Sequence, residues 1–165
     1  MVPLPVDDVA PFEDWQAAAR AALAFLHSTV GMDVWMVTRV EGAEQVVVHS
    51  HPSELAPPGL AIPWDQSFCN RMVSGIGPRV ATVTAATPAY TALMSGFAER
   101  VAAYIGVPLV TPTGAVFGTV CAVSSRAQPR STARFLPLVE LTARLLSSLL
   151  PTTLPDAADP DHRPG

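Results

Sequence analysis

The sequence predicts a single α+β domain in which helices flank an antiparallel sheet. Two β-rich segments separated by a short turn sequence occur twice, and each such pair predicts a hairpin. Segments with helical periodicity lie at both ends of the chain and between the hairpins. The chain has 165 residues, of which 49% are hydrophobic, and this is enough for one domain with a core but too little for two ordinary ones.

The first elements are a helix and a hairpin. Apolar residues recur every three or four positions over 12–30, which predicts a helix. Glu13 and Asp14 stand at its start, where the helix dipole favours negative charge, and Gly31 is placed to end it. The β-rich runs 34–40 and 45–49 flank the turn sequence EGAE, so we expect two antiparallel strands here.

A proline-rich segment, HPSELAPPGLAIPWDQ, follows the first hairpin and predicts a long mobile loop that could act as a lid. Asp65 or Ser67 can cap a short helix that continues through Met72 and ends at the glycines of the sequence GIG. The sequence PRVATV then predicts a strand. This order places Cys69 on the short helix.

The second half predicts a short helix, a hairpin and a last helix. Pro88 opens a short helix, and the runs VAAYIGVPLV and AVFGTVCAVSS predict strands around the turn TPTG. The last helix is expected over 134–150, with Pro137 at its start. Its large apolar residues, mostly leucines, cover an arc of roughly 200°, which is wider than one core-facing stripe needs, so we expect a partner to cover the rest.

Composition excludes several classes of protein. The formal net charge is −4 and all ten basic residues are arginines, so there is no basic footprint for nucleic acid. Two cysteines cannot build a disulfide framework, and the acidic N-terminal segment does not resemble a signal peptide. No apolar run approaches a membrane span. We therefore expect a soluble, reduced, cytoplasmic protein without membrane or direct nucleic-acid partners.

Two stretches of the chain resemble GAF domains. The run AAYIGVPLVTPTGAVFGTVCAV is similar to the paired strands of the YxGxPL and GTLC types that mark the end of that domain. SFCNRMVSG resembles the pocket helix of GAF sensors found with bacterial histidine kinases and diguanylate cyclases. The resemblance implies an antiparallel sheet of about six strands, with the N- and C-terminal helices on one face and a ligand pocket on the other.

The resemblance also implies domain limits and a role. The GAF domain would occupy 12–150, between a flexible tail over 1–11 and a disordered tail over 151–165. Its family role is sensory or regulatory input in bacterial signal transduction, through an unidentified small-molecule ligand and without catalysis. Such domains often dimerise through their terminal helices, which would cover the excess leucines. No cofactor is identified by the sequence.

The resemblance places seven residues at the expected ligand site. Aromatic walls with a few polar tips are typical of such sites. Arg71, like Arg100, is also a candidate partner for an anion. The seven predicted residues are Trp64, Phe68, Cys69, Arg71, Tyr90, Tyr104 and Cys121.

Cys69 has more than one interpretation. Free cysteines are usually buried and apolar in character, so the first is an inert pocket wall. A position near a helix N-terminus beside Arg71 could instead lower its pKa and make it reactive. GAF relatives that attach bilins carry Cys followed by His, whereas Asn70 follows here. The alternative function is a redox sensor, or a small redox enzyme related to the free methionine sulfoxide reductases, that uses Cys69 and Cys121.

One pair of residues, His49 and His51, has a spacing that suggests a metal site. Residues two apart on a strand face the same side, as two metal ligands must. No third ligand stands at a suitable spacing and Pro52 interrupts the strand, so the sequence predicts no metal.

Overall fold

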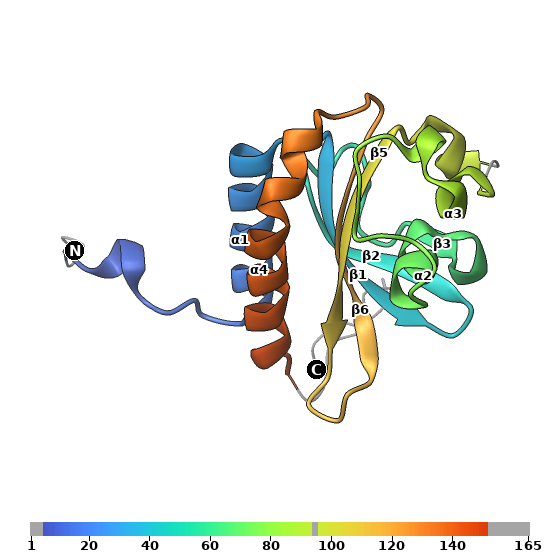
Figure 1. Ribbon diagram of the computed structural model, residues 1–165. Coiled ribbons are helices and arrows are strands. Elements are labelled where there is room, and N and C mark those ends of the chain that lie inside the picture. The colour runs from blue at the N-terminus through green and yellow to red at the C-terminus, as the bar shows by residue number, and fades with distance from the viewer. Residues whose placement is uncertain (1–4, 94–95, 152–165) are drawn as a thin grey trace.

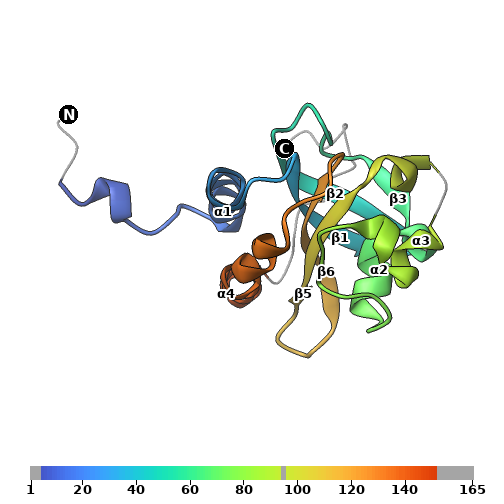
Figure 2. The same cartoon turned by 45° about the horizontal axis from the view of Figure 1, so that its top comes forward.

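The computed structural model describes residues 5–93 and 96–151, which form three layers. Helices α1 (Trp15–Val30) and α4 (Leu136–Ser148) lie side by side on one face of a central sheet (Figures 1 and 2). The short helices α2 (Phe68–Val73) and α3 (Pro88–Thr91) lie on the other face. This arrangement confirms the predicted α+β class and the position of the terminal helices.

The sheet has six strands in the order β3-β2-β1-β6-β5-β4, and every neighbouring pair is antiparallel. The two predicted hairpins are β1–β2 and β5–β6, and they join through the pairing of β1 with β6. The six-stranded antiparallel sheet is therefore confirmed. The strands are β1 (Val34–Glu41), β2 (Glu44–His51), β3 (Ala61–Pro63), β4 (Val80–Ala81), β5 (Ala103–Val110) and β6 (Val116–Ser124).

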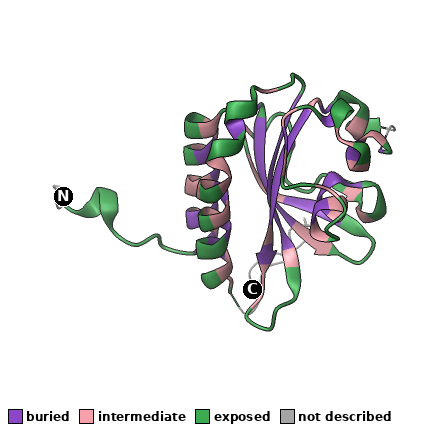
Figure 3. Ribbon diagram, viewed as in Figure 1, coloured by how far each residue is buried: buried purple, intermediate pink, exposed green. Residues whose placement is uncertain are grey.

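Alternate residues of the central strands serve two separate cores. On β6, Val120 and Ala122 pack against α1 and α4, whereas Cys121 and Val123 face α2 and α3. The same alternation occurs on β1 and β5, because successive side chains of a strand point to opposite faces. Both faces of the sheet are thus buried, and the central strands are buried along most of their length (Figure 3).

The two terminal helices are fixed by a few specific contacts. The Asp14 carboxylate accepts a hydrogen bond from the backbone N–H of Ala17 at 2.7 Å, so α1 begins at Trp15. Gly31 follows the helix with a φ of 87°, a conformation that favours glycine. The indole N–H of Trp15 donates to the carbonyl of Leu146 at 2.9 Å and ties α1 to α4.

The segment predicted as one long loop contains regular structure, which corrects that expectation. Residues 61–63 form β3 on β2, and a 3-10 turn, Trp64–Gln66, follows. Backbone hydrogen bonds of Val47 with Gly59 and Leu60 hold the approach to β3. So short an edge strand forms only because it pairs with the strand beside it. The periodicity of the sequence does not predict such a pairing.

Other element limits differ from the sequence prediction. The strand expected in PRVATV is confined to two residues, and α3 covers a single turn before a 3-10 segment, Gly96–Arg100. A 3-10 segment, Arg130–Phe135, precedes α4 and takes up the residues expected to open it. In the part of the chain that the structure describes, no helix is long and apolar enough to cross a membrane. The expected disordered tail lies, from residue 152 on, outside the described residues.

Candidate functional site

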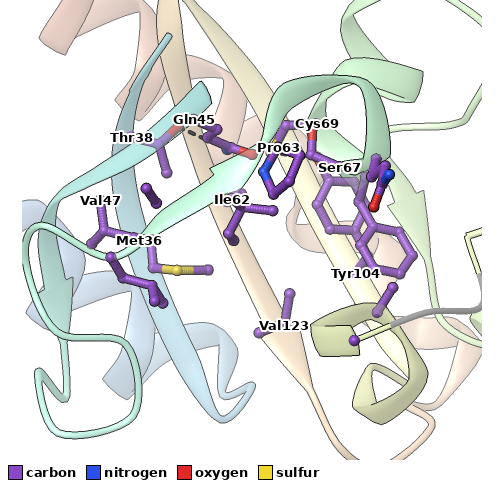
Figure 4. Close-up of a pocket in the computed structure, with 17 residues that line it drawn as sticks. Met36, Thr38, Gln45, Val47, Ile62, Pro63, Ser67, Cys69, Tyr104 and Val123 are labelled. Carbon is purple, nitrogen blue, oxygen red and sulfur yellow. Dashed lines mark hydrogen bonds between the residues drawn. The ribbon is translucent and has the colours of Figure 1, made fainter. Parts of the chain in front are cut away.

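A cavity of about 300 Å³ lies between the sheet and the segment formed by β3 and α2 (Figure 4). Strands β1, β2, β5 and β6 form its floor with Met36, Gln45, Tyr104 and Val123, among other residues. The exposed lining residues belong to 60–66 and to Gly96, so the cavity opens to solvent between these two segments. It lies on the face of the sheet opposite α1 and α4.

The sheet side of the cavity carries a buried polar cluster. The hydroxyl groups of Thr38 on β1 and Thr119 on β6 are 2.6 Å apart. The side-chain amide of Gln45 on β2 donates to Thr38 at 2.9 Å and to Thr119 at 3.3 Å. All three side chains are buried, so three adjacent strands place one connected hydrogen-bond network beneath the cavity.

Helix α2 holds Cys69 against this network. The Ser67 hydroxyl accepts the backbone N–H of Asn70 at 3.0 Å and caps the helix, which brings Cys69 into its first turn. The Cys69 sulfur lies 3.3 Å from the Thr119 hydroxyl and 3.2 Å from that of Tyr104. The thiol is therefore surrounded by donors although it is buried.

These donors determine how the two thiols ionise. Burial opposes ionisation of Cys69, but hydrogen bonds from Cys121, Thr119, Tyr104 and Gln45 outweigh it and lower the pKa of Cys69 to about 7. The hydrogen bond to Cys69 and burial both raise the pKa of Cys121 well above its usual value. The arrangement is one ionisable thiol, Cys69, beside one that stays protonated, Cys121.

Three aromatic rings pack together behind Cys69. Phe68 stacks on Tyr104 with ring centroids 5.4 Å apart and planes 23° apart. Tyr90 contacts both rings, with centroid distances of 5.1 Å to Phe68 and 5.3 Å to Tyr104. Burial and the nearby Cys69 charge raise the pKa of both tyrosines, so both hydroxyls remain protonated donors.

The structure separates the seven predicted site residues into two groups. Phe68, Cys69, Tyr104 and Cys121 line the cavity. Tyr90 does not: it lies behind Phe68, beside a second cavity of about 270 Å³, and its hydroxyl donates to Pro78. Trp64 and Arg71 are outside the lining as well, although both are partly buried. Tyr90 and Trp64 nevertheless pack in the same core cluster as the four lining residues.

Sequence reasoning missed much of the cavity wall. Met36, Thr38 and Gln45 were not predicted, although Met36 and Thr38 share one face of a predicted strand. Gln45 is a polar residue beside a run of valines, and that contrast was an available signal. The order of the strands in the sheet decides which strand faces line the cavity. Local sequence patterns do not reveal that order.

His49 and His51 point to the same face of β2, as their spacing predicts. His49 contacts the Trp15 ring and hydrogen-bonds Gln16, and the ring of His51 packs on that of His27 with centroids 5.1 Å apart. All three contact residues belong to α1. Within the described ranges 5–93 and 96–151, no group of three or more potential metal ligands is present.

A family model described as GAF domain matches residues 14–150. Among curated proteins, none matches the chain. Several solved structures share the fold. One is a free methionine-(R)-sulfoxide reductase from Neisseria meningitidis, solved with its substrate: its TM-score is 0.61 at 23% identity, over 86% of this chain and 80% of that one.

Two further structures are similar at 17% identity. The PixJ GAF domain of Thermosynechococcus elongatus has a TM-score of 0.55, over 82% of this chain and 86% of that one. The second GAF domain of DevS from Mycobacterium smegmatis has a TM-score of 0.57, over 82% and 94%. At these identities the structural likeness establishes the fold alone.

Proposed function

Because the chain belongs to the GAF domain family, we propose that it is a non-enzymatic sensory domain that binds a small molecule in the cavity beneath β3 and α2. The observation that carries this proposal is the cavity itself. It combines about 300 Å³ of space, a largely apolar wall and a small buried polar cluster, which is the usual composition of a small-ligand site. The domain serves bacterial signal transduction, as the histidine kinase and diguanylate cyclase resemblance suggests.

The output side of the proposed sensor is the layer formed by α1 and α4. Leu141 and Leu145 lie on one stripe of α4 and Leu149 directly follows the helix, and each of the three exposes more than half of its surface. Phe25 of α1 is 50% exposed as well. Clustered exposed apolar residues are typical of interfaces, so we propose a homodimer through the terminal helices.

Native mass spectrometry of freshly purified protein, before and after incubation with a bacterial metabolite extract, tests the ligand proposal. We expect a bound mass that is released on denaturation. Val123→Phe fills the cavity and should abolish this mass, whereas Val116→Phe, on the exposed part of the same strand, should retain it. A bare protein mass under both conditions would contradict the proposed function.

A second candidate function is a thiol redox sensor, and the low pKa of Cys69 beside Cys121 favours it. A peroxide would oxidise the Cys69 thiolate to a sulfenic acid and leave as water or an alcohol. The Cys121 thiol would then attack that sulfur, forming the Cys69–Cys121 disulfide and releasing the sulfenic oxygen as water. Intact-mass analysis after peroxide treatment should show an intramolecular disulfide in the parent and sulfenic acid in Cys121→Ser; two unmodified thiols would exclude this function.

A further inference from the structure

The structure assigns to this cavity a neutral, flat and chiefly apolar ligand that carries one hydrogen-bond donor, and we propose Gln45 as the residue that accepts it. The assignment rests on the proposed function, because it names the class of molecule that the same cavity would bind. Three properties of the cavity wall carry it: its lack of any basic side chain, its aromatic side and the free acceptor of Gln45.

The described lining of the cavity has no basic side chain, and Cys69 is its one group that ionises near neutral pH. The 17 residues drawn in Figure 4 are apolar, aromatic, amide, hydroxyl or thiol residues, with one proline and one glycine. Cys69 is the one ionisable group of low pKa, and its charge would be negative. A buried ion without a partner of opposite charge is strongly disfavoured, so anions are excluded most firmly. By contrast, the second cavity includes Glu99.

The walls favour a flat ring. Phe68, stacked on Tyr104, forms one side of the cavity. Met36, Ile62 and Val123 extend into the same space from β1, β3 and β6 (Figure 4). Aromatic faces and a methionine thioether both interact well with ring systems. A volume of about 300 Å³ is at the lower end for ligand sites, which limits the ligand to a compact molecule.

The Gln45 amide supplies the free acceptor. Its nitrogen donates to Thr38 and Thr119, and the amide also helps to stabilise the Cys69 thiolate. A thiolate can only accept a hydrogen bond, so the nitrogen faces this cluster and the oxygen is the end left for a ligand. Within the described part of the chain, no donor reaches Oε1. The side chain is only 3% exposed, yet it lines the cavity. A ligand with an N–H or O–H group would satisfy this oxygen, whereas a ligand without one would leave it buried and unpaired.

Three matched probes test the assignment by calorimetric titration. Indole is neutral, flat and has an N–H donor; 1-methylindole lacks the donor; indole-3-carboxylate adds a negative charge. We expect indole to bind, 1-methylindole to bind on the order of 5- to 100-fold more weakly, and indole-3-carboxylate to show no measurable binding. Gln45→Met should reduce the preference for indole over 1-methylindole to nearly none. Gln16→Met, on α1 across the sheet from the cavity, should preserve this preference.

The outcomes separate this inference from the proposed function. Tight binding of indole-3-carboxylate that Val123→Phe abolishes would overturn the neutral class and leave the sensor proposal standing. Equal binding of indole and 1-methylindole by the parent would show that Gln45 does not require a hydrogen-bond donor on the ligand. This result needs only the parent, so it holds even if Gln45→Met does not fold. If no probe binds but native mass spectrometry retains a ligand, the identity of that ligand tests the inference. A neutral molecule with an N–H or O–H donor would support it, and a charged molecule or one without a donor would overturn it. If neither experiment finds a ligand, both proposals fall.

Discussion

Two glycines of the motifs that resemble GAF domains are required because a side chain would not fit, although neither adopts a positive φ. A Cβ at Gly118 of β6 would collide with the backbone carbonyl of Thr38 on the neighbouring strand. A Cβ at Gly106 of β5 would collide with the hydroxyl end of Tyr104. The first obstacle is fixed backbone and the second is a side chain, so the two positions should respond differently to alanine.

Gly118→Ala should lower the free energy of unfolding by about 1 to 3 kcal/mol or prevent folding, because β1 and β6 must separate.

Gly106→Ala should fold but displace the Tyr104 hydroxyl, and the loss of this donor should raise the pKa of Cys69. Urea unfolding and thiolate absorbance measure the two effects. Parent-like stability of Gly118→Ala would contradict the packing argument.

The ionisation of Cys69 should make stability depend on pH. Its folded pKa of about 7 is below the usual value, so the folded state favours the thiolate. The resulting contribution is fully present above the unfolded pKa and is lost as pH falls through 7. The free energy of unfolding of the parent should therefore rise from about pH 7 to 9 relative to Cys69→Ser.

Urea unfolding at several pH values measures this difference. Cys121→Ala removes the thiol hydrogen bond that lowers the pKa of Cys69, so it should narrow the pH range over which the free energy of unfolding rises. Parallel curves for the parent and Cys69→Ser would show that the thiol does not ionise in this range. Cys69→Ser should itself fold, since a hydroxyl can keep the contacts with Thr119 and Tyr104.

At the scale of elements, α4 has one buried face and one exposed face. Leu146 is 3% exposed and Leu150 packs against the same core. Leu141 and Leu145 are 54% and 56% exposed, on the outer side of the helix layer. The division into two leucine pairs follows from the helical period, and the structure shows which pair faces the sheet.

Replacing each pair with glutamate tests the proposed dimer. Leu141→Glu with Leu145→Glu should give a folded monomer, since charges at exposed positions disrupt only an interface. Leu146→Glu with Leu150→Glu should unfold the domain, because it places charges in the core. Circular dichroism and sedimentation velocity measure folding and assembly. A parent that sediments as a monomer at high concentration would contradict the dimer.

The elements that sequence reasoning identified are those whose signals are local. Both main hairpins and the terminal helices follow from turn residues and from apolar periods along the chain. Strand β3 was missed because Ala61–Pro63 has a proline and no alternation, and its pairing depends on β2. Four of the seven predicted site residues line the cavity, but the Gln45 cluster needs three strands in register.

At the scale of the whole molecule, one edge of the cavity belongs to the segment between β2 and α2. Its prolines predict mobility, while burial of Ala56 and the Ser50 hydrogen bond to the Ala56 carbonyl at 2.5 Å anchor its middle. We expect hydrogen exchange over 52–66 to be faster than in β1 and β6 without ligand and to slow on binding. Protection equal to that of the central strands in ligand-free protein would contradict this.

The alternation of side chains along β1, β5 and β6 has a consequence for how such a domain can diverge. One set of positions shapes the cavity, and the intervening set holds the helix layer. A lineage can therefore acquire a new chemical preference through substitutions at Met36, Cys121 or Val123 while Val37, Val120 and Ala122 go on seating the same helices. Positions that line the cavity and positions that hold the helices alternate along the same strands, so substitutions can change one set and leave the other intact.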